Sequence, residues 1–248
     1  MQSHKPFLLI AAAMLGLSAN AMATDQLTIG TVGNYPPFNT LDASGQVGGF
    51  DIEIALALCA KLKAECTVIT AASNDLVPAL YSHQVDFVAA SVPIVEPSPD
   101  VDFTAPYYTD MLQFIALKEG DFRTDPVNLK DKTLGAQRGS QAATWLQNSL
   151  SGTSIRLYDT EQDAYADLIA GRLDGLLADK YASYDWMKTD AGKNFEFKGK
   201  AVVENNHMGL ATRKGDPLRD RLNGALQELV TDGTYKKIND KYFPFSIY

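Results

Sequence analysis

The segment Gly30-Thr-Val-Gly-Asn-Tyr-Pro-Pro-Phe38 most constrains the fold, because it ends a short apolar strand with a turn that carries an aromatic side chain. The strand is Leu27 to Thr31. After the turn, apolar residues four apart predict one face of a helix, at Phe50, Ile54, Leu58 and Leu62. A strand that leads through a turn into a helix is typical of an open α/β sheet. Such a sheet binds ligands at the carboxyl ends of its strands, where Tyr35 lies.

The rest of the chain alternates short apolar runs with helical patterns, which indicates an α/β fold. We expect further strands at 66–70, 85–91, 111–117, 134–137, 155–158, 173–178 and 208–212, and a short apolar run at 201–203. We expect helices at 73–81, 139–150, 161–170, 217–230 and 232–242. The strand at 111–117 is expected to carry the chain into a second lobe.

Residues 1–23 have the pattern of a secretory signal peptide. Lys5 supplies the positive charge, and the apolar run from Phe7 to Leu17 is too short to span a bilayer. Ala21-Met22-Ala23 fits a small-x-small cleavage site, so Thr24 is expected to begin the mature chain. Cleavage after Ala21 and an uncut anchor are the alternatives. The sequence therefore predicts export.

The formal net charge of −8 argues against a nucleic-acid partner and leaves no basic patch for lipid headgroups. The chain has two cysteines, Cys59 and Cys66, and an even number in an exported chain favours a disulfide over two buried thiols. The three histidines, His4, His83 and His207, form no metal-ligand spacing with the cysteines. We expect neither a metal nor a cofactor.

Further motifs follow in order along the chain. They are Val85-Asp86, Val101-Asp-Phe-Thr-Ala-Pro-Tyr107, Gly135-Ala-Gln-Arg-Gly-Ser140, Leu168-Ile-Ala-Gly-Arg-Leu-Asp-Gly175, Asp232-Gly-Thr-Tyr-Lys-Lys-Ile238 and Lys241-Tyr-Phe243. Together with the opening turn and Gly49-Phe-Asp-Ile-Glu-Ile-Ala55, they resemble the periplasmic solute-binding proteins of ABC importers. Within these, the chain is most similar to the polar amino-acid-binding family, family 3, of the lysine-arginine-ornithine and histidine type.

This resemblance implies an α/β fold of two lobes, the type II periplasmic binding protein fold. Each lobe would be a mixed sheet flanked by helices, with two crossover strands as a hinge. Lobe 1 would comprise residues 24–110 and 205–248, and lobe 2 residues 111–204. The resemblance also implies a disulfide between Cys59 and Cys66, a periplasmic location, a monomer, and a membrane permease as partner.

A free amino acid buried between lobes needs a partner for each of its charges, because an unpaired buried charge is costly. Asp179 ends the apolar run 173–178, and the resemblance implies that it receives the α-ammonium. It also implies that Tyr35 stacks on the ligand side chain and that Ser91 meets the ligand through its backbone and hydroxyl. The alternatives are a helix cap at Asp179, a core tyrosine at Tyr35 and a strand-end cap at Ser91.

Ser140 and Gln141 open a predicted helix, whose free N–H groups can receive a carboxylate. The resemblance implies that use, and a plain cap is the alternative. The arginine that clamps the carboxylate in similar proteins is absent, since no Lys or Arg occurs from Ser82 to Thr109. Arg138 is a candidate replacement, with an exposed arginine as the alternative.

Two further positions depart from that family. Val32 stands where binders of basic ligands carry an aspartate, and Ser73 where a second aromatic wall is found. We therefore expect a wider and less charged pocket than that of a lysine binder.

The main functional prediction is a receptor that captures a small polar ligand, an amino acid or a related compound, and delivers it to an ABC importer. One alternative is a sensing module of the same fold that serves a chemoreceptor or sensor kinase. A remote alternative is a dehydratase-type enzyme. The sequence contains no Gly-x-Ser-x-Gly, no His-Glu-x-x-His and no glycine-rich phosphate loop. His207 alone makes no catalytic set, so we expect no enzyme activity.

Overall fold

The structure is a computed structural model that describes residues 25–95 and 97–248. The expected signal peptide and the mature start at Thr24 lie outside the described residues.

One large sheet runs through the molecule in the order β10-β9-β11-β8-β12-β6-β1-β5, and β7 also pairs with β12. These strands are β1 (Gln26–Thr31), β5 (Glu65–Thr70), β6 (Phe87–Pro93), β7 (Val101–Phe103), β8 (Tyr108–Leu117), β9 (Thr133–Gln137), β10 (Ser154–Tyr158), β11 (Gly175–Asp179) and β12 (Phe195–Arg213). A second, small sheet contains β2 (Asn34–Tyr35), β3 (Asn39–Leu41) and β4 (Val47–Gly48). Strand β1 is parallel to β5 and β6, and β9 is parallel to β10 and β11. The pairs that involve β8 and β12 are antiparallel, so the large sheet is mixed.

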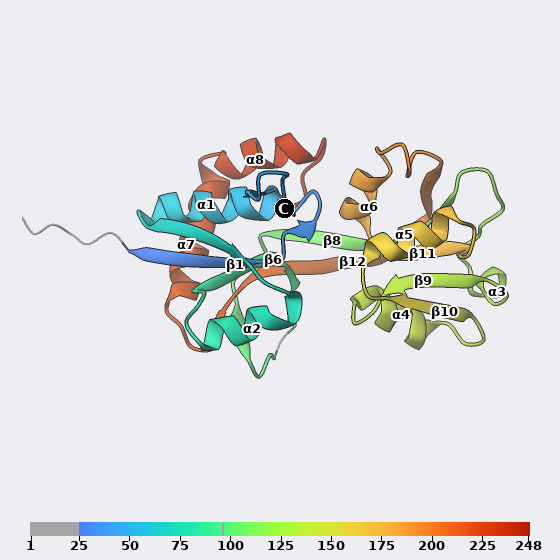
Figure 1. The fold of residues 1–248 in the computed structure, drawn as a ribbon, viewed down its shortest axis with the longest axis horizontal. Helices are drawn as coiled ribbons and strands as arrows, with labels where there is room; N and C mark the ends of the chain where they lie inside the picture. Colours follow the sequence, from blue (N-terminus) through green and yellow to red (C-terminus); the bar gives the residue numbers. More distant parts are fainter. Residues whose placement is uncertain (1–24, 96) are drawn as a thin grey trace, which may run out of the picture.

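Helices cover the sheet at its two ends and divide the molecule into two lobes (Figure 1). One lobe carries α1 (Phe50–Leu62), α2 (Ser73–Tyr81), α7 (Leu218–Thr231) and α8 (Thr234–Tyr242). The other carries α3 (Pro126–Leu129), α4 (Gln141–Ser149), α5 (Glu161–Ile169) and α6 (Lys180–Trp186). Within the described residues, only β8 and β12 run through both lobes. The predicted two-lobe α/β fold is confirmed, and the boundaries at 110 and 204 remain a division made from the sequence.

Strand β12 is longer than the sequence pattern suggested. The two apolar runs at 201–203 and 208–212 belong to one strand from Phe195 to Arg213. Its pairing with β8 shifts register between Lys198 and Val203, and again before Asn206. Each such irregularity turns side chains out of strict alternation, which hides the continuity of the strand from a period-two pattern.

The expected disulfide is present between Cys59 on α1 and Cys66 on β5, whose Cα atoms are 6.2 Å apart. The alternative of two buried thiols is therefore wrong. The bridge ties the end of the first helix to the edge strand of the sheet over a sequence separation of 7. Loop-entropy arguments give it a contribution of roughly 2–3 kcal/mol to stability.

A buried carboxylate holds the first helix under the Pro-Pro turn. Asp51, in the first turn of α1, is fully buried. It accepts hydrogen bonds from the Tyr107 hydroxyl at 2.6 Å, from Asn39 Nδ2 at 2.8 Å and from Ser91 Oγ at 2.9 Å. These three residues come from three separate segments of the lobe, so the Asp51 network fixes the base on which Tyr35 is displayed.

Candidate ligand-binding site

A cavity of about 730 Å³ lies between the lobes. Its lining includes all six residues singled out from the sequence, namely Tyr35, Ser91, Arg138, Ser140, Gln141 and Asp179. Val32 and Ser73 also line it. The cavity volume is in the range of small-molecule sites, and its place at the carboxyl ends of parallel strands is where open α/β sheets bind ligands.

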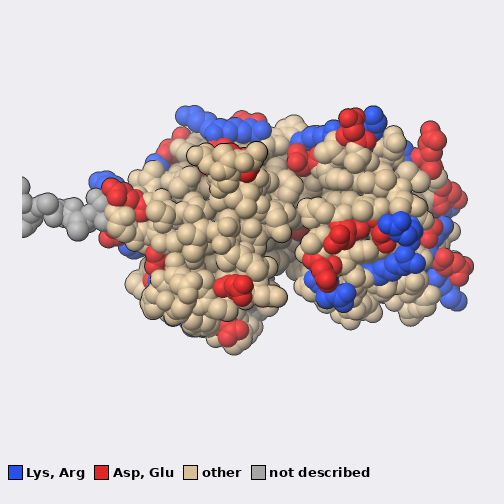
Figure 2. Space-filling model, in the orientation of Figure 1, with Lys and Arg blue, Asp and Glu red and all other residues tan. Residues whose placement is uncertain are grey.

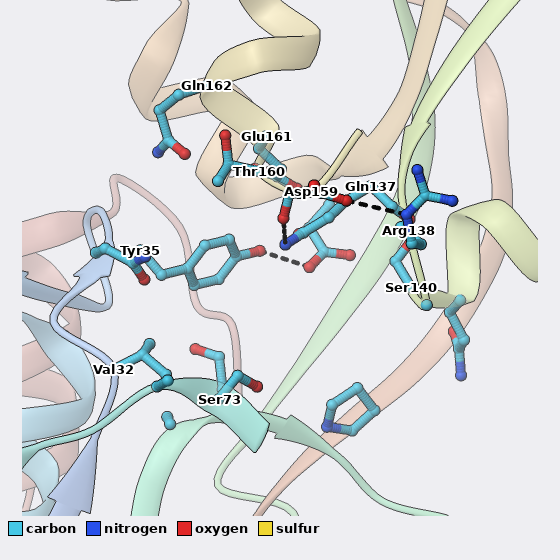
Figure 3. A pocket seen from close by; sticks show the side chains of 18 of the residues that line it. Val32, Tyr35, Ser73, Gln137, Arg138, Ser140, Asp159, Thr160, Glu161 and Gln162 are labelled. Carbon is cyan, nitrogen blue, oxygen red and sulfur yellow. Dashed lines mark hydrogen bonds and ion pairs between the residues drawn. The ribbon is translucent and has the colours of Figure 1, made fainter. Parts of the chain in front are cut away.

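The hydroxyl of Tyr35 points into the cavity (Figure 3), where it meets a carboxylate of the other lobe, Asp179. The hydroxyl of Tyr35, on β2 of one lobe, donates a hydrogen bond of 2.5 Å to Oδ2 of Asp179, at the end of β11 in the other. The ring of Tyr35 stacks on Phe38 with centroids 5.5 Å apart, and Phe38 is fully buried. The core therefore holds one face of the ring.

Asp179 occupies the N-cap position of α6, but its side chain makes no capping hydrogen bond. The alternative of a capping carboxylate is therefore not what the structure shows. Burial raises the pKa of Asp179, and the hydrogen bond from Tyr35 opposes that rise. The Asp179 carboxylate is left without a cationic partner among the described residues.

Two fully or nearly fully buried acids lie within electrostatic reach of Asp179. Glu161, the first residue of α5, is 8 % exposed and lines the cavity. Burial, and then the charge of Asp179, raises the pKa of Glu161 to about 8. Asp110, on β8, is fully buried, and its pKa is raised well above the usual value by burial and then by Asp179. The cleft therefore concentrates acidic groups that pair with no cation in the described part of the chain, and the raised pKa values express the cost of ionising them together.

Two buried oxygens beside the cavity have no hydrogen-bond partner among the described residues. One is Oδ1 of Asn206, which is 2 % exposed and lines the cavity. The other is Oδ2 of Asp110, whose residue pairs with Asn206 across β8 and β12. Buried acceptors are normally satisfied, so these two indicate a missing donor.

Ser91 lines the cavity, but its hydroxyl and its N–H already donate hydrogen bonds within the protein. Its hydroxyl donates to Asp51 Oδ2 at 2.9 Å, and its N–H donates to the Tyr107 hydroxyl at 3.3 Å. Its φ of 51° is in the left-handed region, which non-glycine residues adopt at a cost. The Asp51 network holds this conformation, so the structure links Ser91 to the floor of the cavity.

The start of α4 forms another part of the wall. Ser140 is its N-cap, and the Ser140 hydroxyl accepts from the N–H of Ala143 at 3.1 Å and donates to the Gln137 carbonyl at 2.7 Å. The plain capping alternative for Ser140 is thus observed. Gln141 is the first helical residue, and its N–H belongs to the turn that lacks intrahelical partners.

Arg138 lines the rim of the cavity and is exposed. Its Nε donates to Asp159 Oδ1 at 2.9 Å, and its Nη2 donates to the Leu157 carbonyl at 3.2 Å. Figure 3 shows its guanidinium group beside Asp159 and on the far side of the cavity from Tyr35. Arg138 is thus engaged by its own lobe.

Sequence reasoning missed Glu161, Asn206 and Asp110 as parts of the site. An acid at a helix start, such as Glu161, is explained equally well by the helix dipole. Asn206 falls just before an expected strand, where no pattern marks it. Their convergence depends on how the two lobes face each other. Asp159, Glu161 and Asp179 all lie in the lining, and the expected difference from the pocket of a lysine binder stays a prediction.

Most of the face in Figure 2 is uncharged, and its Lys and Arg side chains form small groups that have Asp or Glu beside them. Among residues 25–95 and 97–248, no helix is long and apolar enough to cross a membrane. The same residues contain no group of acids, histidines and cysteines arranged for a metal ion.

Two lobes on a mixed α/β sheet, two strands that pass between them and a cavity in the cleft define the class of two-lobed solute-binding receptors. The chain belongs to the bacterial extracellular solute-binding proteins, family 3, whose pattern matches residues 27–245. The family resemblance read from the sequence motifs is confirmed.

Three similar proteins illustrate this membership. The L-arginine-binding protein of Pseudomonas aeruginosa is 38 % identical over 252 residues, covering 97 % of each chain. The lysine/arginine/ornithine-binding periplasmic protein of Escherichia coli is 32 % identical over 257 residues, covering 98 % of this chain and 99 % of the relative. A solved structure of an ancestral amino-acid-binding protein, described as a precursor of cyclohexadienyl dehydratase, superposes with a TM-score of 0.78 at 26 % identity and covers 88 % of this chain and 95 % of its own.

Proposed function

We propose that this receptor binds an amino acid or a related amine in the cleft between its lobes. It would do so as a periplasmic monomer, close by a hinge in β8 and β12, and present the ligand to the permease of an ABC importer. The observation that carries the ligand proposal is Asp179, a half-buried carboxylate that lines the cavity without a cationic partner among the described residues. An ammonium group is the ligand feature that offsets the cost of such a charge.

Each sequence-derived residue has a role in this proposal. Asp179 receives the ammonium group, and Tyr35 offers its ring face to the ligand, where a desolvated cation gains about 2 kcal/mol. Ser91 supports the floor through Asp51. Ser140 and Gln141 present the start of α4 to the polar part of the ligand. Arg138 stays with Asp159 at the rim and contributes only if it leaves that pair.

Transport is favoured over the other two candidate functions by the named relatives, which are binding proteins for basic amino acids. A sensing role for a chemoreceptor or kinase has no specific observation in its favour. A dehydratase role also gains no catalytic set here, and the similar ancestral structure is itself described as amino-acid-binding.

The test begins with a thermal-shift panel of amino acids, amines and small carboxylates. At least one amine-bearing ligand should raise the unfolding midpoint by several degrees, as expected when binding favours the native state. Calorimetry of that ligand should then show that Asp179→Asn weakens binding by roughly 2–5 kcal/mol. Asp190→Asn is the matched control, because the Asp190 side chain is 99 % exposed. A flat panel, or unchanged affinity in Asp179→Asn, would overturn the proposal.

A further inference from the structure

The cavity is lined by more acidic than basic side chains. Asp179 and Glu161 line it as carboxylates without basic partners, and Asp110 adds a third buried acid behind them. Arg138 is the only Lys, Arg or His in the described lining, and its guanidinium is held by Asp159 and by the Leu157 carbonyl. The formal charges of Arg138 and Asp159 cancel. The formal charges of two carboxylates, Glu161 and Asp179, then remain in the lining.

A separate observation points in the same direction. The buried Oδ1 of Asn206, in the same lining, has no hydrogen-bond partner in the described part of the chain. Asp110 is its neighbour on the paired strand, and the buried Oδ2 of Asp110 also lacks a hydrogen-bond partner among the described residues. The Asn206 oxygen can only accept a hydrogen bond, and the carboxyls of Asp110, Asp179 and Glu161 only accept once they are ionised. The cavity therefore offers acceptors and requires a ligand rich in N–H donors and positive charge.

A ligand carboxylate, in contrast, finds no unpaired cation in the described lining. The hydroxyl of Ser140 already donates to the Gln137 carbonyl and accepts from the N–H of Ala143 within its own turn. The first N–H groups of α4 are then the main donors left on that wall, and no free cation accompanies them. A carboxylate placed there would enter a cleft that already carries Asp179 and Glu161. Like charges in a site of low polarity repel strongly, so this group would weaken binding.

The net charge of the ligand then decides among candidates. A zwitterionic amino acid brings no net charge, and a basic amino acid brings one positive charge. A linear diamine or guanidinoalkylamine brings two, which matches the two unpaired carboxylates of the lining.

We propose that the cavity takes a linear amine with two cationic ends and no carboxylate, held by Asp179 and Glu161 together, with Asn206 accepting a further N–H. This inference rests on the proposed function and narrows its ligand. It makes Glu161 a specificity-determining residue, and it makes the start of α4 a neutral polar wall.

The test uses pairs of compounds that differ only by the carboxylate, measured by calorimetry on the purified protein freed of bound solute. The pairs are agmatine and arginine, putrescine and ornithine, and cadaverine and lysine. In at least one pair the decarboxylated member should bind about tenfold or more tightly. Glu161→Gln should reduce that preference several-fold, whereas Glu119→Gln, an exposed acid outside the cavity lining, should leave it unchanged.

Tighter binding of the amino acid in every pair that binds would overturn the inference, and so would an unchanged preference in Glu161→Gln. Amino-acid binding that still depends on Asp179 would leave the proposed function standing while the inference fails. No binding by any of the six compounds would overturn the inference as well. The proposed function then depends on the wider panel, where a flat response would overturn it too.

Discussion

The hydroxyl of Tyr35 donates a 2.5 Å hydrogen bond to Oδ2 of Asp179, and this contact joins the two lobes across the cavity. In this structure the phenol contacts the carboxylate that receives the ammonium group of the ligand in the proposed complex. Burial, followed by the charge of Asp179, holds the pKa of Tyr35 well above its usual value, so the hydroxyl remains a donor. In the proposed complex, a cation that takes Oδ2 of Asp179 would displace the Tyr35 hydroxyl, whereas the ring would stay as a wall.

Two substitutions at Tyr35 separate the ring from the hydroxyl. Tyr35→Phe removes the competing donor and keeps the ring, so the affinity for a cationic ligand should stay within about threefold of the wild type or improve. Tyr35→Ala also removes the ring face, and binding should weaken by about 1–2 kcal/mol. Calorimetry with one amine ligand measures both.

The comparison between the two Tyr35 variants is its own control, because both lose the bond to Asp179. If Tyr35→Phe and Tyr35→Ala lose the same affinity, then the hydroxyl of Tyr35 contributes to ligand binding and the ring does not. Tyr248→Phe, at an exposed tyrosine in the C-terminal segment outside the cavity lining, reports any effect unrelated to the site.

The fold was accessible from the sequence because local patterns and the global fold agree. Apolar residues four apart predicted α1, and the segment around Tyr35 predicted a turn at a strand end; both are observed. The disulfide also followed from local information, since Cys59 and Cys66 are close in sequence and the chain pattern predicts export. Such features need only neighbouring residues, so one sequence suffices.

The composition of the site was less accessible, because it depends on which residues the two lobes bring together. Asp179 and Tyr35 are separated by 144 residues, yet they bond directly. Glu161 reads locally as an acid in the first turn of a helix, and only the arrangement of the lobes places it near Asp179. Arg138 shows the converse, since its motif marks the site while its guanidinium binds its own lobe.

The carboxylate of Asp51 should be a main source of stability in the lobe that carries Tyr35. Asp51→Ala removes the acceptor of three buried donors on Tyr107, Asn39 and Ser91. Leaving such groups unpaired should lower the free energy of unfolding by roughly 3–5 kcal/mol in urea titrations.

Asp75→Ala is the matched control for Asp51. Asp75 is also an acid in the first turn of a helix, but it is exposed. Its loss should cost less than about 1 kcal/mol, the size of a helix-dipole contribution. Similar losses for the two variants would show that the hydrogen bonds to Asp51 contribute little.

The last prediction concerns pH and the acid Glu161. Its pKa is raised from 4.5 in the unfolded chain to about 8 in the folded protein, by burial and then by Asp179. Below about pH 4.5 the carboxyl is protonated in both states, and its contribution to stability is fully present. As the pH rises towards about 8, the unfolded chain ionises first, so the free energy of unfolding falls.

The groups that face Glu161 are Asp179, Asp110, Tyr165 and Tyr35, and none of them is a cation. The empty protein should therefore lose thermal stability between about pH 5 and pH 8, and Glu161→Gln should flatten that decline. The decline should not vanish, because the raised pKa values of Asp179 and Asp110 act in the same direction. Glu119→Gln should keep the wild-type slope. A carboxyl that changes protonation on unfolding must contribute to the pH dependence of stability. If thermal stability falls with pH equally in wild type and Glu161→Gln, then Glu161 is already ionised in the ligand-free folded protein, and the prediction is wrong.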